Sequence, residues 1–191
     1  MADIKSLKTE IRKQALARRD RLSAAERLEF SDQIKNTFFE LDIAPNVITS
    51  AFLPIKSEVD LNALIKELWV QQRDVCLPFM LDKENIEFRA YDKKTELVDN
   101  GFGTVAPSAA SQTVDPDVML VPLSAFDETG GRIGYGAGFY DRAIAKLLDA
   151  DKTPLLIGAA FSCQQVDHVP CEEHDIPLDM ILTEDGLIIA D

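Results

Sequence analysis

A short apolar run followed by a glycine-rich segment constrains this chain more than any other feature. The run covers residues 118–123 and is followed by five of the nine glycines, which fall between residues 130 and 138. A helical pattern begins directly afterwards, at Phe139. A strand, a glycine loop and a helix in this order present backbone N–H groups and a helix N-terminus to a phosphate. The segment therefore predicts an α/β fold with a phosphate-binding loop.

The glycine spacing matches neither common phosphate motif. A Walker A loop needs a Gly-Lys-Ser/Thr ending, which is absent, and the dinucleotide fingerprint is G-x-G-x-x-G. Here Gly134, Gly136 and Gly138 run G-x-G-x-G. The alternative is a plain glycine-rich turn. Charged and phenolic side chains within and beside the loop argue against it, namely Arg132, Tyr135, Tyr140, Asp141 and Arg142.

Composition limits the classes of partner. With 191 residues and 46% apolar content, the chain is predicted to form a single domain over residues 1–191. Its net charge of −13 argues against non-specific nucleic-acid binding. Lacking a long apolar segment and a signal-peptide core, it is predicted to be cytoplasmic with no membrane partner. The three cysteines show no C-x-x-C spacing and are expected to be free thiols. Cys171, His168 and His174 could hold a metal, but a polar loop explains them equally well.

Hydrophobic periodicity predicts four helices. They cover residues 4–21, residues 24–41 behind a Ser23–Glu26 capping box, a segment capped by Asp60, and residues 139–150. The third helix turns Leu61, Leu64, Ile65 and Leu68 inward, and the last turns Ile144, Leu147 and Leu148 inward. Lys5, Lys8, Arg12 and Arg19 form a basic stripe on the first helix.

Apolar runs between the helices predict the strands, at residues 47–53, 75–78, 86–91, 118–123 and 155–161, with a C-terminal hairpin from 180–183 and 187–189. Residues 92–116 are expected to form a long functional loop. Alternation of helices and apolar strands predicts a three-layer α/β fold, with a mostly parallel, Rossmann-like sheet and helices on both faces. Ligands of such sheets bind at the carboxyl ends of the strands. Residues 54–60, 126–141 and the segments after Pro78 and Phe161 are expected to converge there.

Four segments, in order, resemble the 5-formyltetrahydrofolate cyclo-ligase family, also called 5,10-methenyltetrahydrofolate synthetases. They are Lys8-x-x-x-Arg12 with the later Arg21-Leu22-Ser23, then residues 54–60 (PIKSEVD), residues 121–127 and residues 131–142 (GRIGYGAGFYDR). The last is the most specific. The sequence departs from the family at Ala137, where many members carry glycine or lysine, and at Phe139, where tyrosine is common. The first departure puts a phosphate contact in doubt, and the second removes a hydroxyl.

The resemblance implies an enzyme that uses ATP and Mg²⁺ to convert 5-formyltetrahydrofolate to 5,10-methenyltetrahydrofolate. In such an enzyme the formyl oxygen attacks the γ-phosphoryl group, the position-10 nitrogen closes the ring, and phosphate leaves. This chemistry needs alignment and charge neutralisation, and no enzyme nucleophile. The expected partner is a reduced folate, with or without a polyglutamate tail, and the expected state is a monomer.

Roles follow from the matched positions. The resemblance implies that Arg132 and Tyr140 are catalytic and that Asp141 and Asp175 bind magnesium, although other acids lie near Asp175. It implies nucleotide binding by Lys8, Arg12, Arg132, Ile133, Gly134, Tyr135, Gly136, Ala137, Gly138, Phe139 and Tyr140. It implies folate binding by Leu53, Glu58, Tyr135, Gly136, Ala137, Gly138 and Phe139. Alternatively, Lys8 and Arg12 form a solvated basic face, and Glu58 is a helix N-terminal acid.

Two other functional classes are compatible with a fold of this kind. One is a non-catalytic regulatory protein that binds a nucleotide or a folate. The other is a sugar-phosphate isomerase or CoA transferase, which rests on analogy of fold alone. A sugar-phosphate isomerase or CoA transferase would not explain the basic first helix. A folate-dependent ATPase activity would distinguish an enzyme from the regulatory protein.

Overall fold

The computed structural model describes residues 3–101 and 103–190. Its main sheet has eight strands, in the spatial order β12 (Gly186–Ile189), β11 (Met180–Thr183), β10 (Leu155–Ala159), β7 (Val118–Pro122), β1 (Thr49–Ser50), β2 (Val75–Met80), β3 (Ile86–Ala90) and β6 (Thr113–Val114). The five central strands, β11 to β2 in that order, are parallel, whereas β12, β3 and β6 pair antiparallel. The mostly parallel sheet and the C-terminal hairpin are therefore confirmed.

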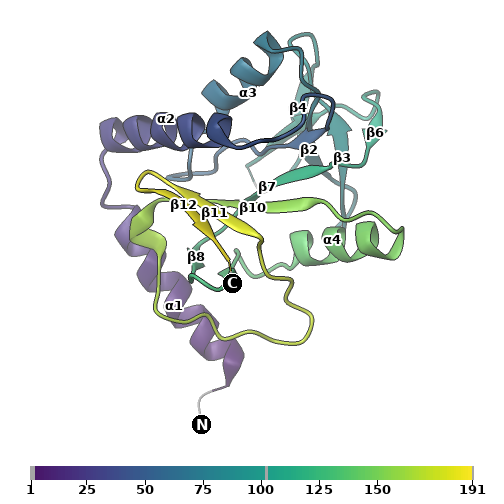
Figure 1. The fold of residues 1–191 in the computed structure, drawn as a ribbon. Coiled ribbons are helices and arrows are strands. Elements are labelled where there is room, and N and C mark those ends of the chain that lie inside the picture. Colours follow the sequence, from purple (N-terminus) through teal and green to yellow (C-terminus); the bar gives the residue numbers. More distant parts are fainter. Residues whose placement is uncertain (1–2, 102, 191) are drawn as a thin grey trace.

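Helices cover both faces of the sheet, which gives the predicted three layers (Figure 1). Helices α2 (Ala24–Glu40) and α3 (Asn62–Val70) lie on one face, and α4 (Phe139–Asp149) lies on the other. Strand β7 shows why two cores form, because its successive side chains point to opposite faces. Leu120 packs with the α2–α3 core, whereas Met119 and Val121 pack with the α4 core.

Local signals set most helix boundaries. The capping box of α2 is confirmed, since Ser23 Oγ accepts from Glu26 N and the Glu26 carboxylate accepts from Ser23 N. Two expectations are wrong in detail. The N-cap of α3 is Leu61, and not Asp60. The Asp60 carboxylate still accepts a hydrogen bond at 2.8 Å from the N–H of Asn62, the first residue of the helix. Leu148 lies in the last turn of α4 and is 43% exposed, so the expectation that it points inward is wrong.

Very short strands account for the other differences. Residues 92–116 are not one loop, because they contain the hairpin β4 (Leu97–Asp99) and β5 (Val105–Pro107) as well as β6. Strand β1 is only two residues long within the predicted 47–53. A second hairpin, β8 (Ala125–Phe126) and β9 (Arg132–Ile133), divides the glycine-rich stretch. Strands of two or three residues contain too few alternating positions to give a period-2 signal.

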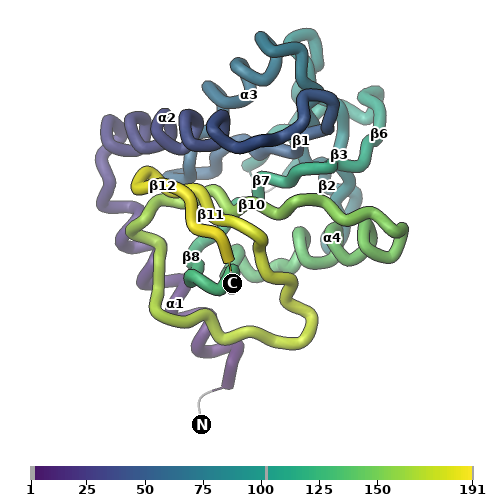
Figure 2. The backbone as a smooth tube through the Cα atoms, viewed as in Figure 1, coloured from purple at the N-terminus to yellow at the C-terminus, as the bar shows by residue number. Residues whose placement is uncertain are grey.

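Several connections meet at the carboxyl edge of the parallel strands. Chain segments leave β1, β7 and β10 at this edge, and α1 (Ile4–Arg19) lies beside the segments after β7 and β10 (Figure 1). Ala15 of α1 is buried with Ala125, Ile133 and Val169. Figure 2 shows residues 162–178 passing α1 and returning to the sheet at β11. In the part of the chain described, none of the helices has the length and apolarity that a bilayer crossing requires.

Candidate active site

The first part of the glycine-rich stretch is a tightly packed turn. Gly130 and Gly131 lie between β8 and β9, where the buried Asp127 carboxylate accepts from Gly131 N at 3.0 Å and from Val169 N at 2.7 Å. Gly130 has φ +83°, and a Cβ at this position would lie 2.3 Å from the carbonyl oxygen of Leu178. At Gly131 a Cβ would lie 2.9 Å from the Asp127 carboxylate. Close packing therefore favours glycine at both positions, and this turn is structural.

The second part, residues 134–138, is an open loop in front of α4. A Cβ on Gly134 would meet no atom of the described residues within 4 Å. Gly136 has φ +97°, and Gly138, with φ +66°, is the N-cap of α4. Tyr135 is 44% exposed and Ala137 is also exposed. This segment places accessible backbone at a helix N-terminus, where anions are favoured.

Two cations of α1 reach this edge. Arg12 Nε donates to the carbonyl oxygen of Gly134 at 2.6 Å, and burial lowers the pKa of Arg12. Lys8 Nζ contacts Glu172 at 2.9 Å and also Asp175. Partial burial lowers the pKa of Lys8, but the hydrogen bonds to these two acids outweigh it and raise the pKa overall. The side chain of Lys8 is only 13% exposed. Both side chains are thus partly covered and bonded to protein atoms, which a fully solvated basic face would not be.

Arg132 lies on β9 and is buried, although the sequence places it in the loop. Its Nη2 donates to Asp141 Oδ1 at 2.6 Å, and its Nη1 donates to the carbonyl oxygen of Ile176. Burial lowers the pKa of Arg132, and the charges of Asp141 and Asp175 oppose this shift. Arg132 thus connects β9, α4 and the segment at residue 176 behind the open loop.

Two buried polar atoms under the loop have no hydrogen-bond partner in residues 3–101 and 103–190. They are Glu58 Oε1 and the Tyr140 hydroxyl. The other carboxylate oxygen of Glu58 accepts from Ile55 N at 2.8 Å. Burial raises the pKa of Glu58, and the Ile55 amide, Tyr135 and Arg19 oppose that shift. Burial also raises the pKa of Tyr140, and the charge of Glu58 adds to it.

Buried polar groups are normally hydrogen-bonded, so Glu58 Oε1 and the Tyr140 hydroxyl fit the donors and acceptors of a polar ligand. The Tyr135 hydroxyl lies near the segment that carries Glu58, because Arg19 donates both to it and to Ser57 Oγ. Burial raises the pKa of Tyr135 to about 12, and the charge of Glu58 adds to this shift. Leu53 is half-buried against the α2–α3 core and lies five residues before Glu58 in the sequence. The expected folate residues are thus found at the same edge as the open loop.

The residues predicted to bind a metal lie close to Arg132 and Lys8. Asp141 Oδ1 accepts from Arg132 and from Ile176 N, at 3.3 Å. Asp175 Oδ2 accepts from Lys8 and from Glu172 N. Burial would raise the pKa of Asp175, but its hydrogen bonds to Lys8 and to Glu172 N lower the pKa overall.

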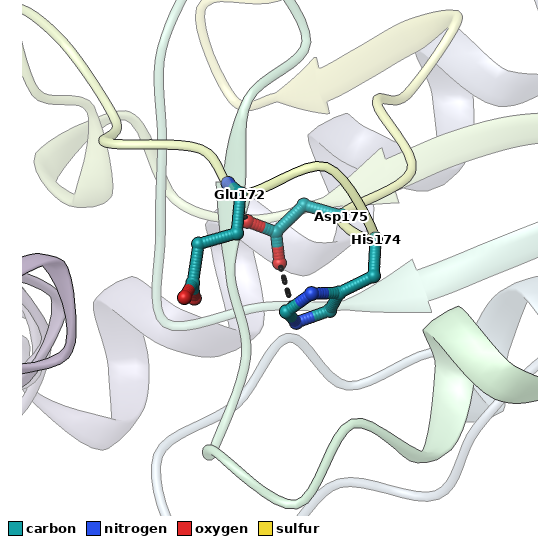
Figure 3. A group of neighbouring side chains, drawn as sticks. All are labelled: Glu172, His174 and Asp175. Carbon is teal, nitrogen blue, oxygen red and sulfur yellow. Dashed lines mark hydrogen bonds and ion pairs between the residues drawn. The ribbon is translucent and has the colours of Figure 1, made fainter.

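Each of these two carboxylates keeps one oxygen with no hydrogen bond from the described residues, Oδ2 in Asp141 and Oδ1 in Asp175. Glu172, His174 and Asp175 bring ligand atoms within 4.8 Å of one another, and Figure 3 shows Asp175 with its carboxylate directed at the His174 ring. Carboxylate oxygens are suitable Mg²⁺ ligands. Of the two predicted magnesium ligands this group contains Asp175 and not Asp141, and Cys171 and His168 do not belong to it either.

Two arginines of α1 make contacts at this edge for which no role was predicted from the sequence. Arg18 donates to the carbonyl oxygens of Cys163 at 2.5 Å and Gln165 at 3.0 Å, and Arg19 donates to Ser57 Oγ and the Tyr135 hydroxyl. Helical periodicity could place Arg19 on the basic stripe of α1. It could not predict that Arg19 is buried, because a basic residue on a helix surface is usually solvated.

A hollow elsewhere on the protein is not part of this site. It has a volume of about 490 Å³, lies at the amino ends of the parallel strands, and is lined by Ile48, Trp69, Arg73, Tyr91 and their neighbours. None of the expected site residues lines it. The expected site residues lie at the opposite edge of the sheet, where the parallel strands end.

The model of the 5-formyltetrahydrofolate cyclo-ligase family matches residues 4–184. The chain belongs to this family. It is 36% identical over 137 residues to the 5-formyltetrahydrofolate cyclo-ligase of Haemophilus influenzae, covering 69% of this chain and 72% of the relative. The Escherichia coli (strain K12) relative of the same name is 37% identical over 140 residues, covering 70% and 76%.

The fold of this cyclo-ligase family member has a matching solved structure. The 5,10-methenyltetrahydrofolate synthetase of Aquifex aeolicus superposes with a TM-score of 0.82 at 30% identity, covering 96% of this chain and 92% of that one. The family predicted from the residue motifs is thus confirmed. The fold predicted from periodicity is confirmed as well.

Proposed function

We propose that this protein catalyses the ATP- and Mg²⁺-dependent conversion of 5-formyltetrahydrofolate to 5,10-methenyltetrahydrofolate, with release of ADP and phosphate. The observation that carries the proposal is a convergence at one edge of the sheet. The α1 cations Lys8 and Arg12, the open loop 134–138 and the buried carboxyl of Glu58 all meet there.

The nucleotide is assigned to α1 and the loop. Lys8 and Arg12 would contact its phosphates, and residues 132–140 would supply backbone N–H groups next to the N-terminus of α4. The open space over Gly134 supports this assignment, since a phosphate could approach the backbone there. Lys8 pairs with Glu172 and Asp175, so phosphate oxygens would compete with these carboxylates.

The folate is assigned to Glu58 and its surroundings. A carboxylate can accept two hydrogen bonds from an amino-pyrimidine edge, and Glu58 Oε1 has no partner among the described residues. Leu53 and the rings of Tyr135 and Phe139 would border the ligand. Such a fixed, buried carboxylate favours a ligand that brings its own N–H donors.

The chemistry requires charge neutralisation and alignment. The formyl oxygen bonds to the γ-phosphorus while the bond to the ADP oxygen breaks, which gives a phosphorylated formyl intermediate. The position-10 nitrogen then bonds to the formyl carbon and loses its proton, and phosphate leaves with the former formyl oxygen. Arg132 would stabilise the transferred charge and Tyr140 would contact the reacting groups.

Magnesium is assigned to Asp141 and Asp175. One or two carboxylates with phosphate oxygens form a usual Mg²⁺ site, and the ion would neutralise phosphate charge. Each of these two carboxylates has one oxygen with no hydrogen bond within the described ranges, which supports the assignment. Glu172 and His174 are the neighbouring alternatives.

The proposal extends to the setting of the reaction. We propose one catalytic domain over residues 1–191, acting as a cytoplasmic monomer on a reduced folate, with or without a polyglutamate tail. The acidic net charge of −13 supports the absence of a nucleic-acid partner.

One experiment tests the function. The protein is incubated with 5-formyltetrahydrofolate, ATP and MgCl₂, and the absorbance of the methenyl product is followed, with omission of each component in turn. We expect product only in the complete mixture. Equal product without ATP would contradict the ligase mechanism. Tight binding of ATP and folate with no turnover would instead support the non-catalytic regulatory protein.

A further inference from the structure

Arg19 links three segments of the proposed site from within the protein. It is only 1% exposed. Its Nε donates to Ser57 Oγ at 3.0 Å, and its Nη2 donates to the Tyr135 hydroxyl at 2.9 Å. One guanidinium on α1 therefore fixes both the loop that carries Tyr135 and the residue directly before Glu58.

This buried charge has an unusual environment. No carboxylate of the described residues lies within 4.0 Å of the Arg19 guanidinium. Hydrogen bonding links Arg19 to a carboxylate only indirectly, because Ser57 Oγ accepts from Arg19 and donates in turn to Asp20. Burying a charge without a paired ion is costly, and a well-packed apolar side chain is often at least as stable. Stability alone therefore gives little reason for an arginine here.

The surroundings of Arg19 indicate a role in ligand binding. Tyr135 is the exposed aromatic residue of the open loop, and its ring lies 6.0 Å from the Arg19 guanidinium carbon. Glu58 follows Ser57 directly and carries the unpartnered Oε1. The positive charge of Arg19 also opposes the rise that burial causes in the pKa of Glu58.

We propose that Arg19 is a positioning residue for the folate, which holds the Tyr135 ring and the Glu58 carboxylate in fixed relation so that both contact one ligand. This inference rests on the proposed function for the identity of that ligand. Arg19 differs from Lys8 and Arg12 in exposure, because its side chain is almost completely covered, whereas those of Lys8 and Arg12 are partly exposed. It acts through Tyr135 and Ser57, and not by direct contact with phosphate.

The test is a double-mutant cycle on the full-length protein with Arg19→Met, Tyr135→Phe and the double variant. We expect each single substitution to raise the KM for 5-formyltetrahydrofolate about tenfold, as for loss of one charge-assisted hydrogen bond. The double variant should be within about threefold of either single one, because both remove the same contact. The KM for ATP should change by less than about twofold.

Two outcomes would overturn the proposal. One is a double variant about a hundredfold weaker than the wild type, which means that the two residues act independently. The other is an equal rise in the KM for ATP, which means that Arg19 supports the loop as a whole. If Arg19→Met does not fold, Arg19→Lys replaces it, because a lysine retains the charge but not the fork that reaches both Ser57 and Tyr135.

The proposed function is tested separately within the same experiment. If the wild type forms no product, the proposed activity is contradicted whatever the variants do. Calorimetric titration of 5-formyltetrahydrofolate, which needs no turnover, then decides the role of Arg19. Unchanged folate affinity in both Arg19→Met and Tyr135→Phe would contradict it.

Discussion

Gly130 and Gly131 in the first part of the glycine-rich stretch and Gly134 in the second part have opposite surroundings. At residues 130–131 a Cβ would collide with packed atoms, 2.3 Å from Leu178 O at Gly130 and 2.9 Å from the Asp127 carboxylate at Gly131. At Gly134 a Cβ would meet nothing among the described residues within 4 Å. Lack of space explains the first pair, whereas no packing contact requires glycine at Gly134, where we propose that a phosphate approaches the backbone. Glycine clustering alone therefore does not mark a ligand site, and the surroundings of each glycine decide.

Gly130→Ala should have the largest effect on stability. The substitution forces φ +83° on a residue with a Cβ and overlaps a backbone oxygen, which together should cost about 3 kcal/mol. The melting temperature should fall by roughly 6–12 °C. Activity per folded molecule should stay within about twofold of the wild type. Gly103→Ala is the matched control, since Gly103 has φ +75° and no described atom within 4 Å of its Cβ position.

Gly134→Ala should do the reverse. Its Cβ would project into the open space over the loop, so the free energy of unfolding should change by about 0.5 kcal/mol or less. The KM for ATP should rise about tenfold, because the methyl group keeps a phosphate away from the backbone N–H groups. Thermal melts and steady-state titration of ATP measure both. A large loss of stability with an unchanged KM would remove the distinction between the two parts.

Most of the architecture could be predicted from periodicity, because α2, α4 and the central strands bury continuous apolar faces. The hairpin β8–β9 could not, since two-residue strands have no periodic signal. Because this hairpin was not predicted, Arg132 was assigned to the glycine loop, although its side chain is buried and bonded to Asp141. Arg19 was assigned to a basic stripe, and only tertiary packing shows that it is covered.

Glu58→Gln should give a smaller effect, on the pH dependence of stability. Burial raises the pKa of Glu58 from 4.5, so the folded state holds this proton more firmly than the unfolded state. As pH rises from the unfolded value through the folded pKa, the free energy of unfolding therefore falls. The glutamine variant, which cannot ionise, should be more stable than the wild type at pH 7, and this advantage should vanish below about pH 4.

Chemical denaturation at several pH values measures this effect. Glu29→Gln, on an exposed part of α2, is the matched control and should follow the wild-type curve. A Glu58→Gln variant that is less stable than the wild type at pH 7 would show that the ionised carboxylate is well compensated within the protein. That result would weaken the case that its Oε1 serves a ligand.

The division of the site into a nucleotide side and a folate side is tested most directly by titrating both substrates against Lys8→Met and Glu58→Gln. Each variant loses charge-assisted hydrogen bonds to one proposed ligand, so one KM should rise about tenfold. We predict that Lys8→Met raises the KM for ATP and leaves the KM for 5-formyltetrahydrofolate within about twofold, and that Glu58→Gln does the opposite. The division is contradicted if both variants raise the KM of the same substrate. It is also contradicted if Lys8→Met raises the KM for the folate and Glu58→Gln raises the KM for ATP.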